Sequence, residues 1–227
     1  GLCAGVTAGF MVLGRDQIAM LCAWLLVLFT LWRIVGWSLL ANLRAAVKPA
    51  LAGVVGGLAV AAVPLAFSIA LAMQSNRPSI DFAGAAKGSM SPLAALTAVV
   101  ANLYGVDGPM SDFWGPPSSL VWGENDFVLA RNMGAIYFGA LPFAALVCVG
   151  LVRGAFLRRE IWFFVVAALL TGFYAIGSYT PFFSYSYFLP GVDLFRRPAD
   201  ATFPLCAMLA ILSGYCVHRW LEEMGGG

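Results

Sequence analysis

The chain has 227 residues, of which 61% are apolar and 11% are charged, and its formal net charge at pH 7 is +2. A soluble domain carries roughly 25% charged residues, so this chain has too few charges to build a solvated surface around a core. The small net charge gives no indication of nucleic-acid binding. We therefore expect an all-α integral membrane protein whose helices span the bilayer.

Apolar segments recur along the chain at about the length of 20 residues that a membrane helix needs. An apolar, glycine-rich start at residues 1–14 is followed by further segments at 18–40, 50–73, 133–152, 161–176 and 203–220. The predicted fold is a polytopic helical bundle of about six transmembrane segments, forming a single membrane domain over residues 1–227. The chain begins without an initiator Met or a basic signal-peptide region, so we expect it to be a fragment of a larger protein.

The least apolar stretch is a long loop at residues 74–132, rich in Asp, Asn, Ser, Gly and Pro. Within it, Ser91 followed by Pro92 is a usual pair at a helix start. Apolar residues then recur at helical spacing, at Leu93, Leu96, Val100 and Leu103. The pattern predicts a short helix near residues 92–104, too short to span the membrane and lying on its surface or against the bundle.

Basic residues gather in two short turns, the first with Arg44 and Lys48 and the second with Arg153, Arg158 and Arg159. Cytoplasmic loops are enriched in Lys and Arg near the helix ends, so both turns are expected to face the cytoplasm. Three polar stretches then share the extracytoplasmic face: residues 15–17, the long loop, and a connector at 177–202.

Two adjacent arginines, Arg196 and Arg197, come directly before the last predicted helix. A guanidinium group binds phosphate oxygens in a bidentate manner, and a helix start adds unpaired N–H donors. The pair therefore suits the phosphate of a lipid headgroup, with membrane lipids as the partner. The alternative is that the arginines pair with Asp193 and Asp200, or only anchor the chain at headgroups.

The long loop also carries aromatic and acidic residues suited to sugar binding, among them Trp114, Trp122, Glu124 and Asp126. The alternative is that the tryptophans form an interfacial aromatic belt and that the acids are solvated. Glu124 and Asp126 are compatible with a divalent metal but do not specify one, and we predict no metal site. The five cysteines lie in apolar segments and are interpreted as packing residues.

The connector holds three short motifs in order: Gly-Ser-Tyr-Thr-Pro at 177–181, Leu-Pro-Gly at 189–191, and Phe-Arg-Arg-Pro-Ala-Asp at 195–200. This order resembles the late transmembrane region of bacterial YfhO-type membrane proteins, in which the last motif reads Phe-Arg-x-Pro-Ala-Arg. Weaker likenesses occur at residues 13–17, 75–77 and 213–215. Arg196 occupies the family's arginine position, whereas Asp200 replaces its second arginine and Arg15-Asp16 replaces a His-Pro pair.

The family resembles GT-C-type glycosyltransferases. The resemblance implies an enzyme of the bacterial cytoplasmic membrane that transfers a sugar from a polyprenyl-phosphate carrier to an extracytoplasmic acceptor, with its catalytic carboxylate upstream of Gly1. Under this hypothesis Arg196, Arg197 and Arg15 bind the lipid phosphate. The substrate-binding residues would be Asp16, Gln17, Tyr179, Trp114, Trp122, Glu124 and Asp126. Two alternatives stay open: a transporter or flippase for a lipid-linked saccharide, and a non-catalytic assembly subunit.

Overall fold

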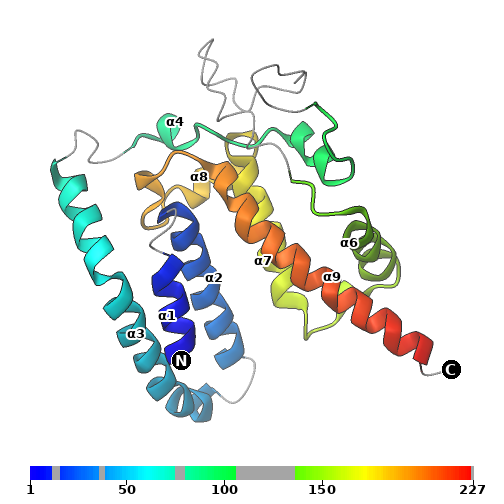
Figure 1. Ribbon diagram of the computed structural model, residues 1–227, viewed down its shortest axis with the longest axis horizontal. Coiled ribbons are helices and arrows are strands. Elements are labelled where there is room, and N and C mark those ends of the chain that lie inside the picture. Colours follow the sequence, from blue (N-terminus) through cyan, green and yellow to red (C-terminus); the bar gives the residue numbers. More distant parts are fainter. Residues whose placement is uncertain (12–15, 36–38, 75–79, 106–135, 226–227) are drawn as a thin grey trace. The chain divides into compact units, whose positions relative to one another are not determined.

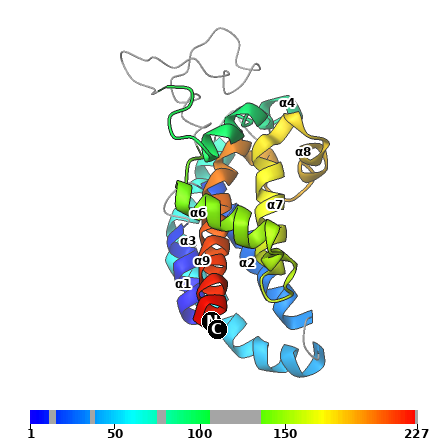
Figure 2. The ribbon, with the colours of Figure 1, turned by 90° about the vertical axis from the view of Figure 1, so that its right-hand side faces the viewer.

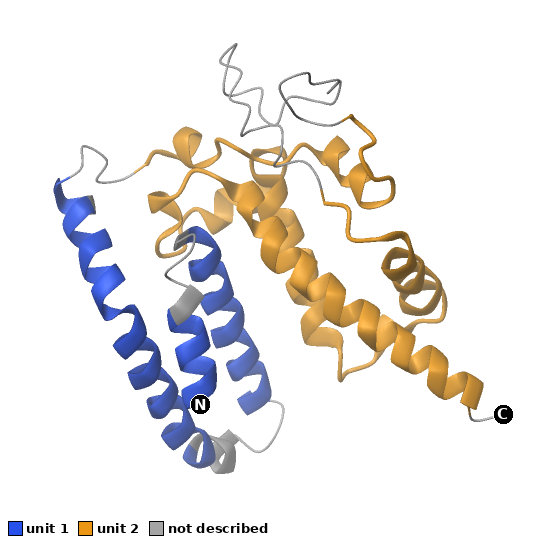
Figure 3. Cartoon of the chain, viewed as in Figure 1, with its two compact units in different colours: residues 1–79 blue, residues 80–227 orange. Residues whose placement is uncertain are grey.

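The computed structural model describes residues 1–11, 16–35, 39–74, 80–105 and 136–225, and the regular elements in these ranges are helices (Figure 1). Four helices in the described ranges are long and apolar enough to cross a membrane: Gln17–Val35, Arg44–Leu71, Trp162–Tyr179 and Pro198–Gly225. The prediction of an all-α protein is confirmed for the described residues, and these four helices agree with a protein that crosses the membrane several times. The predicted number of six segments stays a prediction. The chain divides into two compact units, residues 1–79 and 80–227 (Figure 3).

The first unit contains α1 (Leu2–Met11), α2 (Asp16–Val35) and α3 (Leu39–Gln74). Glycines allow the backbones of α1 and α3 to approach closely: a Cβ on Gly5 would overlap the backbone of Gly53, and a Cβ on Gly57 would lie 2.8 Å from the carbonyl oxygen of Gly5. Residues four apart share a helix face. The two helices therefore pack in parallel through a stripe of small residues, as membrane helices often do.

Helix α3 begins earlier than the segment predicted at 50–73. Arg44 and Lys48 therefore lie inside a helix, and the turn that the sequence predicted around them is wrong. The residues before Pro49 are mostly Leu, Ala, Arg and Lys, which favour helix, and long basic side chains can reach the headgroups from within an apolar helix. Helix α2 is described as far as Val35, residues 36–38 of the predicted segment lie outside the described residues, and Leu39 and Leu40 belong to α3.

The second unit is built on two long helices, α7 (Trp162–Ile176) and α9 (Thr202–Gly225), which pack against each other (Figures 1 and 2). The bounds of α7 agree with the predicted segment at 161–176 to within one residue. Helix α6 (Ala140–Ala145) continues as the π-helix η4 (Leu146–Val152), and both pack on α9. Their shared core comprises Leu146, Val149, Ala155, Ile161, Ala168, Leu205, Leu212 and Cys216.

Short helices fill the remainder of this unit. They are α4 (Phe82–Ala85), the 3-10 helices η1 (Pro92–Ala98), η5 (Ala155–Leu157), η6 (Gly177–Tyr179), η7 (Val192–Leu194) and η8 (Pro198–Ala201), and α8 (Pro181–Ser186). The predicted connector at 177–202 is therefore mostly helical turns.

The segment predicted to span at 133–152 is helical only over Ala140–Val152 in its described part. Gly139 precedes the helix with φ +110°, a conformation that side-chain-bearing residues rarely adopt. Pro142 then lies in the first turn of α6, where a missing N–H costs nothing. This helix is shorter than the roughly 20 residues of a full span, so its crossing of the membrane stays a prediction.

The short helix predicted near residues 92–104 is present only as η1, and it is a 3-10 helix. Ser91 precedes it, but its side chain makes no capping hydrogen bond. The turns that follow are held instead by Tyr104, whose hydroxyl donates to the carbonyl oxygen of Leu93 at 2.7 Å. The prediction therefore placed the start of this helix correctly, but the helix ends at Ala98 and not near residue 104.

Candidate functional site

Two segments of the second unit meet where α7 ends and α9 begins: residues 80–90 and residues 177–201. We refer to them together as the loop platform, which includes α4 and α8 (Figure 1). Hydrogen bonds join the two segments, from Ile80 N to Asp193 O (2.9 Å), from Tyr187 Oη to Ile80 O (2.7 Å) and from Ala199 N to Gly88 O (3.2 Å). Another, from Met90 N to Ala175 O (2.9 Å), attaches the first segment to the end of α7. The first part of the long loop is therefore attached to the connector.

Ser89 is the centre of these contacts. Its buried hydroxyl donates to the carbonyl oxygen of Ala86 (2.6 Å) and accepts from the backbone N–H of Ser178 (3.0 Å). Each serine follows a glycine with positive φ, +76° at Gly88 and +59° at Gly177, and a Cβ on Gly177 would overlap the Ser89 side chain. The signal in the sequence is a pair of Gly-Ser dipeptides, at residues 88–89 and 177–178, but nothing in the sequence pattern indicates that the two meet.

Arg196 and Arg197 lie half-buried in the irregular stretch between η7 and η8. A Cβ on Gly88 would lie 3.3 Å from Cγ of Arg197, so the stem of this arginine passes close to the Gly88 backbone. Nε of Arg196 is buried and has no hydrogen-bond partner within the described part of the chain. An unsatisfied buried donor costs about 1–3 kcal/mol, and more when the group is charged. An acceptor oxygen of a ligand would remove this cost once the atoms that cover Nε move aside to admit it.

The acidic residues of the loop platform already have structural tasks. The Asp81 carboxylate accepts from Gly84 N at 3.0 Å and so caps α4. Asp193 supplies the carbonyl oxygen that receives the Ile80 N–H. Asp200, in η8, is 6% exposed and takes part in a hydrogen bond or another electrostatic interaction. Of these three residues, Asp81 is the one whose carboxylate is shown to support the fold, whereas Asp193 contributes through its backbone carbonyl.

The predicted site residues fall into three groups. Arg196, Arg197 and Tyr179 belong to the loop platform. Asp16 and Gln17 begin α2 in the first unit, where Gln17 is 5% exposed. The others lie outside the described residues, namely Arg15, Trp114, Trp122, Glu124 and Asp126. The structure thus brings together the connector and residues 80–90, whereas the participation of residues 15–17 stays a prediction.

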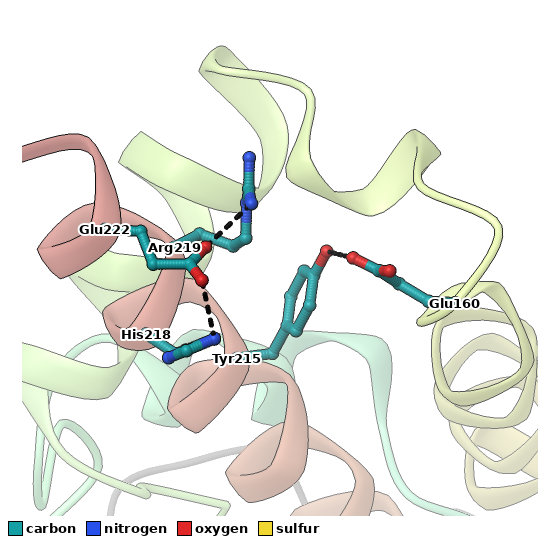
Figure 4. Close-up of polar contacts among 5 residues, drawn as sticks. All are labelled: Glu160, Tyr215, His218, Arg219 and Glu222. Carbon is teal, nitrogen blue, oxygen red and sulfur yellow. Dashed lines mark hydrogen bonds and ion pairs between the residues drawn. The ribbon is translucent and has the colours of Figure 1, made fainter. Parts of the chain in front are cut away.

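A second group of polar contacts lies near the C-terminal end of α9 (Figure 4). Tyr215 donates a hydrogen bond to Glu160, which precedes α7. Glu222 contacts Arg219 (2.8 Å) and His218 (3.3 Å) on the same helix, and Arg153 contacts Glu223 at 2.6 Å. Ion pairs that are exposed in this way are worth about 0–1 kcal/mol each, so we interpret the group as surface contacts that add little to stability, and not as a reaction site.

Among the described residues, no group of three or more His, Cys, Asp or Glu side chains is arranged to hold a metal ion. No family model, curated protein or solved structure matches the chain. The resemblance to YfhO-type proteins therefore depends on the motifs at residues 177–200 and the shorter ones elsewhere. The loop platform, with its two arginines, is the candidate site.

Proposed function

We propose that this chain is part of a GT-C-like membrane glycosyltransferase that uses a polyprenyl-phosphate-linked sugar, and that Arg196 binds the phosphate of the carrier. The observation that carries the proposal is the buried Nε of Arg196, which has no acceptor among the described residues. A phosphate offers several acceptor oxygens in a geometry that matches the planar guanidinium group.

The position of the arginine favours a phosphate that is attached to a lipid. Arg196 follows the candidate span Trp162–Tyr179 and comes directly before the candidate span Pro198–Gly225. The phosphate of a membrane lipid lies at the level where such spans end. A polyprenyl chain could stay in the bilayer while its phosphate reaches Arg196, with Arg197 adding a second positive charge beside it.

In the reaction, Arg196 would act on the leaving group. Negative charge grows on the carrier phosphate as its bond to the sugar breaks, and a fixed cation stabilises that charge more than it stabilises the starting ester. The proton of the acceptor hydroxyl would go to the carboxylate that the family resemblance assigns upstream of Gly1. The sugar and the acceptor follow from that resemblance alone.

The test is sugar transfer from a polyprenyl-phosphate donor by the full-length protein carrying Arg196→Lys or Arg196→Ala. Charge-assisted hydrogen bonds are worth roughly 1.5–3 kcal/mol each, so losing a bidentate pair should reduce donor use well over tenfold. Lysine keeps the charge but not the paired donors, so Arg196→Lys should be impaired and Arg196→Ala more so. Arg159→Ala, at an exposed arginine before α7, is the matched control.

Binding of polyprenyl phosphate without a sugar, measured on the same variants, separates the two parts of the proposal. Full transfer by well-expressed Arg196→Ala would remove the phosphate role from this residue. If the protein binds polyprenyl phosphate and this binding requires Arg196, but no sugar is transferred, the phosphate site is still supported. That result would also favour a transporter or an assembly subunit over the enzyme.

A further inference from the structure

The chain carries no Asp, Glu, Lys or Arg from Ile161 to Val192. Helix α7 accounts for the first half of this run, and the second half continues through η6 and α8 and the turn after it. A segment of this length in water would carry roughly one charged residue in four. The composition of α8 is therefore that of a segment in contact with lipid, although α8 lies beyond the end of the membrane-spanning helix.

Helix α8 has one packed side and one uncovered side. Phe183 is buried and meets the ring of Tyr174 edge to face, with 5.5 Å between the ring centroids. On the other side, Tyr185 is 77% exposed and Phe188, just after the helix, is 84% exposed, followed by the exposed Leu189. Two large aromatic side chains are thus exposed, one on this short helix and one just after it, while the other side of the helix is packed on the core.

The uncovered side of α8 continues the uncovered side of α7. The rings of Phe173 and Phe182 lie 6.2 Å apart, which joins the last turns of α7 to the start of α8. The exposed apolar residues of α7 are Trp162, Leu169, Leu170 and Phe173. Since α7 is a candidate span, this side of it faces acyl chains, and the apolar surface extends from there onto α8.

The length of the span places α8 at the edge of the hydrocarbon. The candidate span Trp162–Tyr179 has 18 residues, or about 27 Å at 1.5 Å per residue, against a hydrocarbon thickness of about 30 Å. Helix α8 begins two residues later and turns back toward Phe173. Tyrosine and other aromatic side chains are favoured at this depth, where the ring is in apolar surroundings and a hydroxyl can reach water.

We propose that α8 and the turn that ends at Pro190 lie in the membrane interface, with Tyr185, Phe188 and Leu189 inserted among the headgroups and the upper acyl chains. The occupant of this surface is the bilayer itself. The inference depends on the uncharged run and on the continuity of the exposed surface, and it holds whether or not the chain uses a polyprenyl-phosphate donor.

The test uses a nitroxide label at Phe188→Cys in a full chain whose native cysteines are replaced, in vesicles of phosphatidylethanolamine and phosphatidylglycerol. Collision of the label with oxygen, which partitions into lipid, is compared with collision with a water-soluble nickel chelate. Labels at Leu169→Cys and Arg159→Cys give the lipid and water references. The oxygen-to-nickel ratio at 188 should lie several-fold above that at 159 and at or below that at 169.

A ratio at 188 equal to that at 159 would overturn the proposal. Spin–spin broadening at 188 that disappears on dilution with unlabelled protein would assign the surface to a second copy, and would also overturn it. A second measurement uses the unaltered protein with lipids that carry a photoreactive diazirine near the glycerol end of the acyl chain. Adducts on residues 185–189 support insertion, and adducts confined to residues 162–173 contradict it.

Discussion

Gly177 has to satisfy two conditions at once. Its φ of +59° suits a residue without a side chain, and the space where a Cβ would stand is filled by the hydroxyl of Ser89. Either condition alone would favour glycine. Together they make this position far more restrictive than that of Gly88, where a Cβ would meet nothing closer than 3.3 Å.

We predict that Gly177→Ala destabilises the second unit by about 1–3 kcal/mol, because the backbone strain adds to the displacement of Ser89. The measurement is the midpoint of thermal unfolding in detergent. Gly214→Ala is the control, since a Cβ at Gly214 in α9 meets nothing within 4 Å and alanine favours helix. Equal midpoints for both variants would show that the platform does not depend on this contact.

The residues of the candidate site could be predicted in part. Arg196 was identified because an arginine pair before a helix is a pattern of neighbouring residues. The pairing of Gly88-Ser89 with Gly177-Ser178 was missed, since its hydrogen bonds join positions 89 residues apart and follow from tertiary packing. The unpaired Nε of Arg196 could not be foreseen for the same reason.

At the scale of helices, the contact between α1 and α3 gives a prediction about backbone packing. A side chain at Gly57 would press on the backbone of Gly5, so Gly57→Leu should separate the two helices and cost about 1–3 kcal/mol. Hydrogen exchange should become faster in peptides from Leu2–Met11 and Leu39–Gln74. Ala59→Leu, at an exposed position of the same helix, should leave exchange unchanged. Equal protection in both variants would argue against the glycine contact.

The helices that the sequence predicted best are those with clear chemical boundaries. Helix α7 lies between the Arg158–Glu160 charges and Gly177, so its limits are visible in composition. The start of α3 was misplaced because Arg44 and Lys48 were interpreted as ending a span, although basic side chains can remain in a helix and extend to the headgroups. The late start of α6 depends on the backbone angle at Gly139, and composition does not reveal that angle.

At the scale of the whole molecule, the orientation in the membrane stays a prediction. Basic residues next to α7 favour a cytoplasmic position for Arg158, and the long loop that contains Asp112 should then be extracytoplasmic. Arg158→Cys and Asp112→Cys, each in a cysteine-free chain, should react with a membrane-impermeant maleimide from opposite sides of oriented vesicles. Reaction from the same side would reverse part of the predicted topology.

The hydrogen bonds within the loop platform also imply an order of events during synthesis. Residues 80–90 leave the ribosome long before the connector, and Ser89 and Gly88 can meet Ser178 and Ala199 only after α7 has been made and inserted. Until then the backbone of this earlier segment has no partner in the connector. Closure of the platform is thus a late step of assembly. In the predicted topology, a chain that inserted the candidate span α7 in the wrong direction would carry Ser178 to the opposite side of the membrane from Ser89.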